Sequence, residues 1–355
     1  MSKRSRNVGG QAVLEGVMMR APGAMAVAVR RGDGRLVVLD EPWRPFWTHP
    51  FIRRLMEAPV MRGGLVLVES VVNGLGALGF AAEQAEGDAY RGPRAAALLP
   101  VLAVLGVQSP RGARAPAIGT LLLSVTFALG LFVGLPHLLA WLVSWLTGGG
   151  WDVDSFAFHL LDGVFKLGIF VGYISLISRI PEIARVFEYH GAEHKVVNAF
   201  ERGRPLQLDE VRLQGTFHAR CGTSFVLVVL LVSVAVFSAI LPLVPPISEH
   251  PILNHLAMIL LKLPLMLPLA GLAYELNRWA SQHPGAAGVN LLVSPGRWMQ
   301  RLTVREPDDA QLEVSLAAIR VALHREGRGS EGQEAPADVR VFEGLPDVEA
   351  AYPLS

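Results

Sequence analysis

Four long apolar runs separate the polar parts of the chain. Each is long enough for an α-helix to cross the hydrocarbon core of a bilayer, which takes about 20 apolar residues. The pattern therefore predicts a mainly α-helical fold, a polytopic membrane helical bundle of about four spans. The predicted spans are residues 118–146, 156–178, 223–247 and 252–276, in two pairs that occupy 118–178 and 223–277.

Two shorter apolar stretches do not meet this criterion. Residues 65–82 contain Glu69 and Asn73, and residues 95–107 are too few for a span. We expect both stretches to lie on or against the membrane surface. A re-entrant segment or a fifth span is the alternative for either of them.

Residues 1–90 predict a small α+β region outside the membrane. Apolar residues alternate along 24–31 and 35–42, and the Gly-Asp-Gly between them is typical of a turn, so the pattern indicates a β-hairpin. A helical pattern follows over 61–84 and includes the membrane-apposed stretch. Residues 91–117 are rich in proline, glycine and arginine and predict a linker.

The C-terminal part predicts one further helix and a flexible end. Within residues 278–326, a Pro-Asp-Asp start is followed by Leu312, Leu316 and Ile319 at helical spacing. Residues 327–355 are rich in glycine, glutamate and proline, which predicts a flexible tail.

The composition supports the membrane interpretation. Hydrophobic residues make up 51% of the chain and charged residues 18%, with a net charge of +1. A soluble domain carries roughly 25% charged residues, so the lipid bilayer is the expected partner. The near-zero net charge gives no general basic field, and no nucleic-acid partner is expected. The single cysteine, Cys221, excludes an internal disulfide.

The distribution of lysine and arginine predicts the orientation of the spans. Residues 1–117 contain 15 of them, 179–222 contain seven and 278–355 contain eight, whereas 147–155 and 248–250 contain none. Because basic loops stay in the cytoplasm, both termini and the loop 179–222 are expected on the cytoplasmic side. The N-terminal segment has no uninterrupted apolar core, so we expect no cleaved signal peptide.

The loop 179–222 contains a pattern typical of metal sites. His190, Glu193 and His194 form H-x-x-E-H, and on a helix these positions share one face. Two imidazoles four residues apart can bind one metal ion, and the glutamate can act on a water molecule, as in the H-x-x-E-H peptidases. The alternative is a polar helix end whose histidines face lipid headgroups.

Further candidate residues follow along the chain. His218 and Cys221 stand three apart just before the third predicted span, and with His190 and His194 they make a His3Cys set suited to a divalent metal, zinc first. Four protein ligands are typical of a structural site, whereas three leave a position for catalysis with Glu193 as the base. A cysteine nucleophile with His218 as its base is a further alternative.

Glu275, at the cytoplasmic end of the fourth predicted span, is the best additional carboxylate for a catalytic base or ligand. Its alternative is an ion pair with Arg278. Asp162, Lys166 and Lys262 lie inside predicted spans, where charges usually face a partner or a water-filled cavity. Asp162 and Lys166, four residues apart, predict a neutralising ion pair, and the alternative is a path for protons or ions.

Six blocks in order along the chain resemble the bacterial YqhQ-like family of multi-span membrane proteins. The resemblance implies a protein of the bacterial inner (cytoplasmic) membrane, in a family of unknown function sometimes described as predicted metal-dependent enzymes. It supplies no catalytic residue. The blocks are GGQAVLEGVMMR (9–20), MRGGLVLVES (61–70), EYHGAEHKVVNAFE (188–201), HARCGTSF (218–225), AYEL (273–276) and QRLTVREPDDAQLEV (300–314).

Two functions are compatible with these observations. The first is a membrane-bound, metal-dependent hydrolase that works at the cytoplasmic surface on a peptide or lipid-like substrate. The second is a non-enzymatic platform, or a transport-related protein, in which the metal is structural. The number of protein ligands around the metal distinguishes the two classes.

Overall fold

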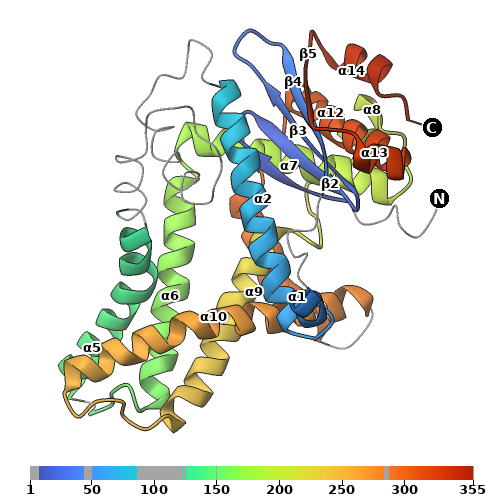
Figure 1. The fold of residues 1–355 in the computed structure, drawn as a ribbon. Coiled ribbons are helices and arrows are strands. Elements are labelled where there is room, and N and C mark those ends of the chain that lie inside the picture. Colours follow the sequence, from blue (N-terminus) through green and yellow to red (C-terminus); the bar gives the residue numbers. More distant parts are fainter. Residues whose placement is uncertain are drawn as a thin grey trace.

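The computed structural model describes residues 8–43, 50–85, 123, 125–148, 150–283 and 288–354. These residues form a helical bundle with a sheet domain at one end (Figure 1). The predicted linker 91–117 and the stretch 95–107 lie outside the described residues.

Five antiparallel strands form one sheet in the order β1-β2-β3-β4-β5. The first four follow one another along the chain, and β5 comes from the C-terminal region and pairs with β4, with Val37 opposite Val341. The strands are β1 (Gly9–Val13), β2 (Gly16–Ala21), β3 (Ala24–Arg30), β4 (Leu36–Pro42) and β5 (Asp338–Phe342).

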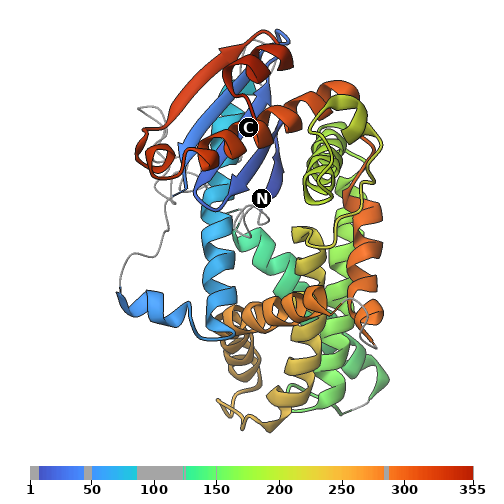
Figure 2. The same ribbon diagram turned by 90° about the vertical axis from the view of Figure 1, so that its right-hand side faces the viewer.

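Helices cover both faces of this sheet. Alternate residues such as Met19 and Ala26 pack into one core with α7 (Pro181–Glu201) and α12 (Asp309–Gly327). The intervening residues pack on the opposite face against the second half of α2 (Met61–Ala85). Both views show the sheet between these helices (Figures 1 and 2).

The sheet is larger than the sequence predicts. The hairpin of β3 and β4 is confirmed, but β1 and β2 were not predicted, because helices on both faces bury β2 on both sides and remove the alternation of polar and apolar residues. The tail expected to be flexible contains β5 and α14 (Leu345–Ala351). Arg325 of α12, buried and paired with Asp40 of β4, also donates to the carbonyls of Gly332, Ala335 and Pro336 and so holds this segment on the sheet.

Among the described residues, five helical segments are long and apolar enough to cross a membrane, one more than predicted. Four coincide with the predicted spans: 125–147, which includes α5 (Leu135–Thr147), α6 (Phe156–Ile177), the segment beginning with α9 (Gly222–Ile240), and α10 (Pro251–Gln282). The fifth is α2, which contains the predicted surface stretch 65–82.

The two halves of α2 have different neighbours. Its first half packs against α10, where a Cβ on Gly271 would overlap the carbonyl oxygen of Val60, and Leu67 joins a core cluster with α9 and α10. Ala77 and Ala81, in its second half, are buried against the sheet. The helix α2 therefore connects the bundle to the sheet domain (Figure 1).

The remaining described elements are short or peripheral. The amphipathic α11 packs along α9 and leads into α12. The remaining described elements are α1 (Pro50–Leu55), the π-helix η3 (Gly130–Gly134), α8 (Leu208–Arg212), the 3-10 helix η4 (Leu241–Leu243), α11 (Val289–Thr303) and α13 (Ser330–Glu334).

Candidate metal centre

Helix α7 presents both motif histidines on one side. The ring centroids of His190 and His194 are 4.4 Å apart, one helical turn along the same face. Gly191 stands between them, where a Cβ would overlap the carbonyl oxygen of Arg305. Glycine at this position lets the segment between α11 and α12 pass directly against the helix.

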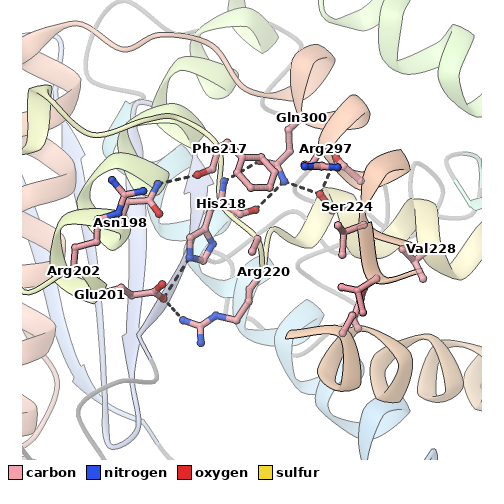
Figure 3. Close-up of a pocket in the computed structure, with 16 residues that line it drawn as sticks. Asn198, Glu201, Arg202, Phe217, His218, Arg220, Ser224, Val228, Arg297 and Gln300 are labelled. Atoms are coloured by element: carbon pink, nitrogen blue, oxygen red, sulfur yellow. Dashed lines mark hydrogen bonds and ion pairs between the residues drawn. The ribbon is translucent and has the colours of Figure 1, made fainter. Parts of the chain in front are cut away.

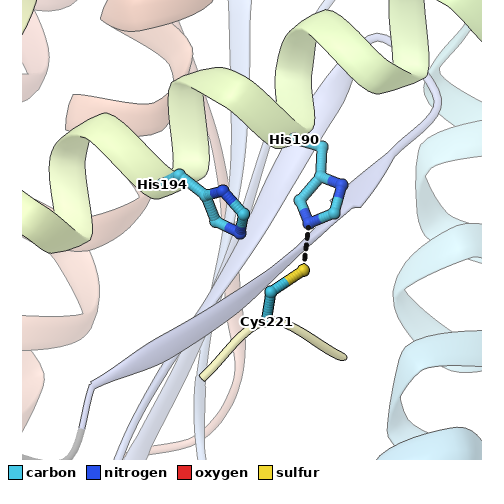
Figure 4. Close-up of side chains that lie close together, drawn as sticks. All are labelled: His190, His194 and Cys221. Atoms are coloured by element: carbon cyan, nitrogen blue, oxygen red, sulfur yellow. Dashed lines mark hydrogen bonds between the residues drawn. The ribbon is translucent and has the colours of Figure 1, made fainter. Parts of the chain in front are cut away.

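Cys221 completes a cluster of three potential ligands. It is the N-cap residue of α9 and reaches toward α7 from the preceding loop (Figure 4). Its Sγ lies 3.3 Å from His190 Nε2, and one ligand atom from each of His190, His194 and Cys221 lies within 4.8 Å of the others. Zinc bound tetrahedrally at about 2.0–2.3 Å separates its ligand atoms by roughly 3.5 Å, so small side-chain rotations would bring these atoms to ligand distances.

The hydrogen bonds of the two histidines suit metal binding. His190 Nδ1 lies 2.9 Å from the carbonyl oxygen of Thr303, and His194 Nδ1 lies 2.5 Å from that of Thr216. A carbonyl oxygen only accepts, so each Nδ1 carries the proton and donates it, which leaves the Nε2 lone pair directed at the cluster. Carbonyl partners of this kind orient histidine ligands in metal sites.

One of these nitrogens has no partner within the described structure. His194 is 1% exposed, and its Nε2 is buried without a hydrogen bond. A buried polar atom of this kind is costly unless something binds it. A divalent metal between His190, His194 and Cys221 would satisfy it, so the residues present fit such an ion.

Cys221 and His190 shift each other's pKa. Burial alone would raise the pKa of the Cys221 thiol, but the hydrogen bond to His190 and the nearby ring of His194 lower it to about 4. Burial disfavours the imidazolium of His190, yet its contact with Cys221 raises its pKa to about 9. Because the thiolate is the form that binds metals, this environment favours the ligand form of Cys221, whereas a metal would have to displace the Nε2 proton of His190 to use its lone pair.

Glu193 lies at the edge of the same cluster. Its carboxylate Oε2 is 3.6 Å from His194 Nε2, the atom without a partner, and the residue is 5% exposed. Strand β1 closes the space behind it, since a Cβ on Gly10 would collide with Glu193 Cγ. The structure thus brings Glu193 together with the three potential ligands.

His218, predicted as the fourth ligand, lies beside the cluster and outside the set of three. Its ring centroid is 5.5 Å from that of His194, and its Nε2 lies 3.3 Å from Glu201 Oε1. Burial would raise the pKa of Glu201, but His218 and Arg220 outweigh this effect and hold it below the ordinary value. The side chain of Gln300 binds the backbone of His218 on both its N–H and its carbonyl.

Glu275, the second predicted catalytic carboxylate, is engaged elsewhere. Both of its oxygens accept hydrogen bonds from Arg62 at the start of α2. It does not belong to the His-His-Cys cluster. Glu15 likewise pairs with Arg185 through both oxygens. Each of these carboxylates therefore pairs with a guanidinium group and does not lie at the metal centre.

Thr303, Glu201 and Gln300 contribute to the centre but were not predicted. Thr303 acts through its backbone carbonyl, which any residue carries. Gln300 and Thr303 both lie in the block 300–314, and the resemblance of this block to the YqhQ-like family was the sequence signal that could have pointed to them.

The fold and the cluster define a helical protein of membrane type with a sheet domain and a candidate metal centre at their junction. The chain belongs to the family described as "Protein of unknown function (DUF1385)", whose model matches residues 58–325. It is 30% identical over 342 residues to the "Uncharacterized protein YqhQ" of Bacillus subtilis (strain 168), covering 93% of this chain and 96% of that protein. No solved structure matches the chain.

Proposed function

We propose that the protein is a multi-span enzyme of the bacterial cytoplasmic membrane, a metal-dependent hydrolase whose zinc-type site faces the cytoplasm. The observation that carries the proposal is the geometry of the centre. Two Nε2 atoms and a cysteine sulfur converge, Glu193 lies 3.6 Å from one of them, and the described structure supplies only three residues to the cluster. Three protein ligands and an adjacent carboxylate are typical of catalytic zinc sites.

In this proposal each residue has a separate task. His190, His194 and Cys221 would hold the ion, which would supply Lewis acidity and lower the pKa of a bound water. Glu193 takes a proton from the attacking water as the water oxygen bonds to the electrophilic centre of the substrate. It then passes that proton to the leaving group as the scissile bond breaks. Strand β1, behind Glu193, keeps the carboxylate against the cluster.

The topology of the sheet domain supports four crossings. Strands β1–β4 precede the candidate spans and β5 follows them, yet β4 and β5 pair in one sheet. Strands of one sheet lie on the same side of a membrane, so the number of crossings between them is even. Since Ala77 and Ala81 of α2 pack on that sheet, we assign α2 to the cytoplasmic surface. The crossings then belong to 125–147, α6, α9 and α10.

A structural metal site is the second candidate. The observation in its favour is the position of His218, whose ring centroid is only 5.5 Å from that of His194. If that ring turned from Glu201 toward the cluster, it would supply a fourth ligand and close the site. The protein would then be a non-enzymatic platform.

Metal content tests the centre. We expect about one transition-metal ion per chain in detergent-purified protein, because three potential ligands, two of them buried, converge on one point. Replacing His190 and His194 together with alanine removes two ligands and should abolish the metal. Inductively coupled plasma mass spectrometry measures it, with His283→Ala as the control, since His283 is an exposed histidine at the end of α10. Wild-type protein that contains no metal and takes up none would refute the site.

Glu193→Gln separates catalysis from structure. The amide keeps the size of the side chain but is a much weaker base, so we expect retained metal and a fall in hydrolysis of about 10²–10⁴-fold. Turnover of a panel of chromogenic carboxylic and phosphoric esters provides the readout. Glu188→Gln is the matched control: it makes the same change on the same helix, at a carboxylate that accepts a hydrogen bond from Gln311 and does not belong to the cluster. Equal turnover by Glu193→Gln and wild type would favour the structural site.

A further inference from the structure

A pocket of about 550 Å³ lies beside His218 and is separate from the His-His-Cys cluster. The loop 217–220 forms one side, and α7, α9, α10 and α11 supply the rest (Figure 3). Gln300 fixes this loop: its Oε1 accepts from the N–H of His218 at 3.1 Å, and its Nε2 donates to the His218 carbonyl at 2.8 Å. Both residues are buried, so the wall of the pocket is part of the fold.

The polar end of the pocket carries an excess of positive charge. Arg202 and Arg220 reach it from the end of α7 and from the loop, whereas Arg297 of α11 lies near Ser224, toward Val228 (Figure 3). Glu201 is the single carboxylate of the lining, and it pairs with Arg220. Arg202 donates to a neutral amide, that of Gln214. Within the described structure no carboxylate pairs with Arg297, so two guanidinium groups face the pocket without a counter-charge.

The opposite end is apolar and lies at the ends of membrane-type helices. Val228 stands in the second turn of α9, Ala280 stands near the end of α10, and Val289 and Val293 come from α11. Both α9 and α10 lie within candidate spans. If α9 and α10 cross the membrane as proposed above, the apolar end lies at the membrane surface, within reach of a hydrocarbon chain of the bilayer.

We propose that this pocket binds a phosphorylated amphiphile, with its phosphate held by the arginine side chains of the lining and its apolar chain along α9 and α11. A guanidinium binds phosphate oxygens in a bidentate manner, and a phosphate monoester has the oxygens and the charge for two such groups. The same amphiphile is the substrate class of the metal centre; this second statement rests on the proposed function. His218, between the pocket and His194, then borders the phosphate.

Lipid retention in native mass spectrometry tests the binding. Detergent-purified protein is incubated with equal amounts of phosphatidic acid and phosphatidylcholine that have the same acyl chains. We expect one phosphatidic acid per chain, retained in at least about tenfold preference. Glycerol 3-phosphate and inorganic phosphate serve as competitors that have the phosphate but no chain, and they should displace it only weakly.

Two variants probe the two ends of the pocket. Replacing Arg202 and Arg297 together with glutamine removes two charge-assisted contacts and should lower retention of phosphatidic acid at least about tenfold. Val293→Glu places a charge on the apolar wall and should also lower retention. Arg328→Gln, at the exposed C-terminal end of α12, is the matched control. Thermal unfolding and metal content are measured on every preparation.

Each outcome decides one statement. Equal retention of the two lipids, or unchanged retention in the arginine variant, overturns the pocket assignment. Displacement by glycerol 3-phosphate or inorganic phosphate at the affinity of the lipid shows a site for free phosphate and overturns the amphiphile. Because metal is measured separately, selective lipid binding by a metal-free protein refutes the hydrolase and leaves the pocket standing.

Discussion

Gly191→Ala is expected to destabilise the protein by about 3 kcal/mol or more. The added methyl group would overlap the carbonyl oxygen of Arg305, which cannot move freely because the N–H of Arg305 bonds to the carbonyl of Phe187 in α7 at 2.9 Å. Overpacking of this kind costs typically about 1–3 kcal/mol and more against a fixed backbone. Thermal unfolding in detergent measures the effect as a lower midpoint.

The same substitution should also reduce the metal content. The displaced segment includes Thr303, whose carbonyl binds Nδ1 of His190, so the orientation of that ligand would be lost. Gly76→Ala in α2 is the matched control, since nothing lies within 4 Å of a Cβ there and alanine favours the helix. An unchanged midpoint and full metal content in Gly191→Ala would mean that α7 and the segment after α11 are not in this close contact.

Asp162→Ala is expected to cost about 3–5 kcal/mol, because it leaves charges unpaired inside the bundle. Asp162 of α6 lies 2.6 Å from Lys262 of α10 and 3.8 Å from Lys166, and the side chains of Asp162 and Lys262 are each 4% exposed. The sequence left open a neutralising pair of Asp162 with Lys166 or a path for protons or ions, and in the structure Asp162 pairs with both lysines and lies closer to Lys262. A lower unfolding midpoint in detergent or in reconstituted bilayers checks the prediction.

Removing both partners should cost less than removing one. In the double variant Asp162→Leu with Lys262→Leu, apolar side chains replace the closest pair, and only Lys166 remains charged. We expect this variant to be more stable than Asp162→Ala, since replacing a buried ion pair with apolar residues is often neutral. If Asp162→Ala were as stable as wild type, water would reach the lysines, and a hydrated path through the bundle would become the better interpretation.

Each element that was predicted correctly has a periodic pattern of apolar residues within its own sequence. The helix α12 was predicted from its apolar spacing, and Leu312, Leu316 and Ile319 are buried at 1% or less. Strand β2 was missed because both of its faces are covered. Strand β5 was missed because it has only five residues, in a segment rich in glycine, glutamate and proline, and it forms a strand only when the edge of β4 is available.

Part of the metal centre was predictable for the same reason. Helical spacing alone places His190 and His194 on one face. Whether His218 or Cys221 turns toward them depends on the irregular loop between α8 and α9, where the sequence has no period. The loop is held by Gln300 from a distant helix, and no local pattern predicts such a contact. The ion pair between Glu275 and Arg62 was unpredictable in the same way, because the two residues are far apart in sequence and close in space.

The pairing of β5 with β4 constrains how the protein is made. The ribosome completes β1–β4 first and must then translate the candidate membrane helices before β5 emerges. Throughout that interval the free edge of β4, from Leu36 to Asp40, has unpaired backbone groups of the kind that promote aggregation. Nascent chains therefore need a protected edge, through a chaperone or the nearby bilayer, until the last residues leave the exit tunnel.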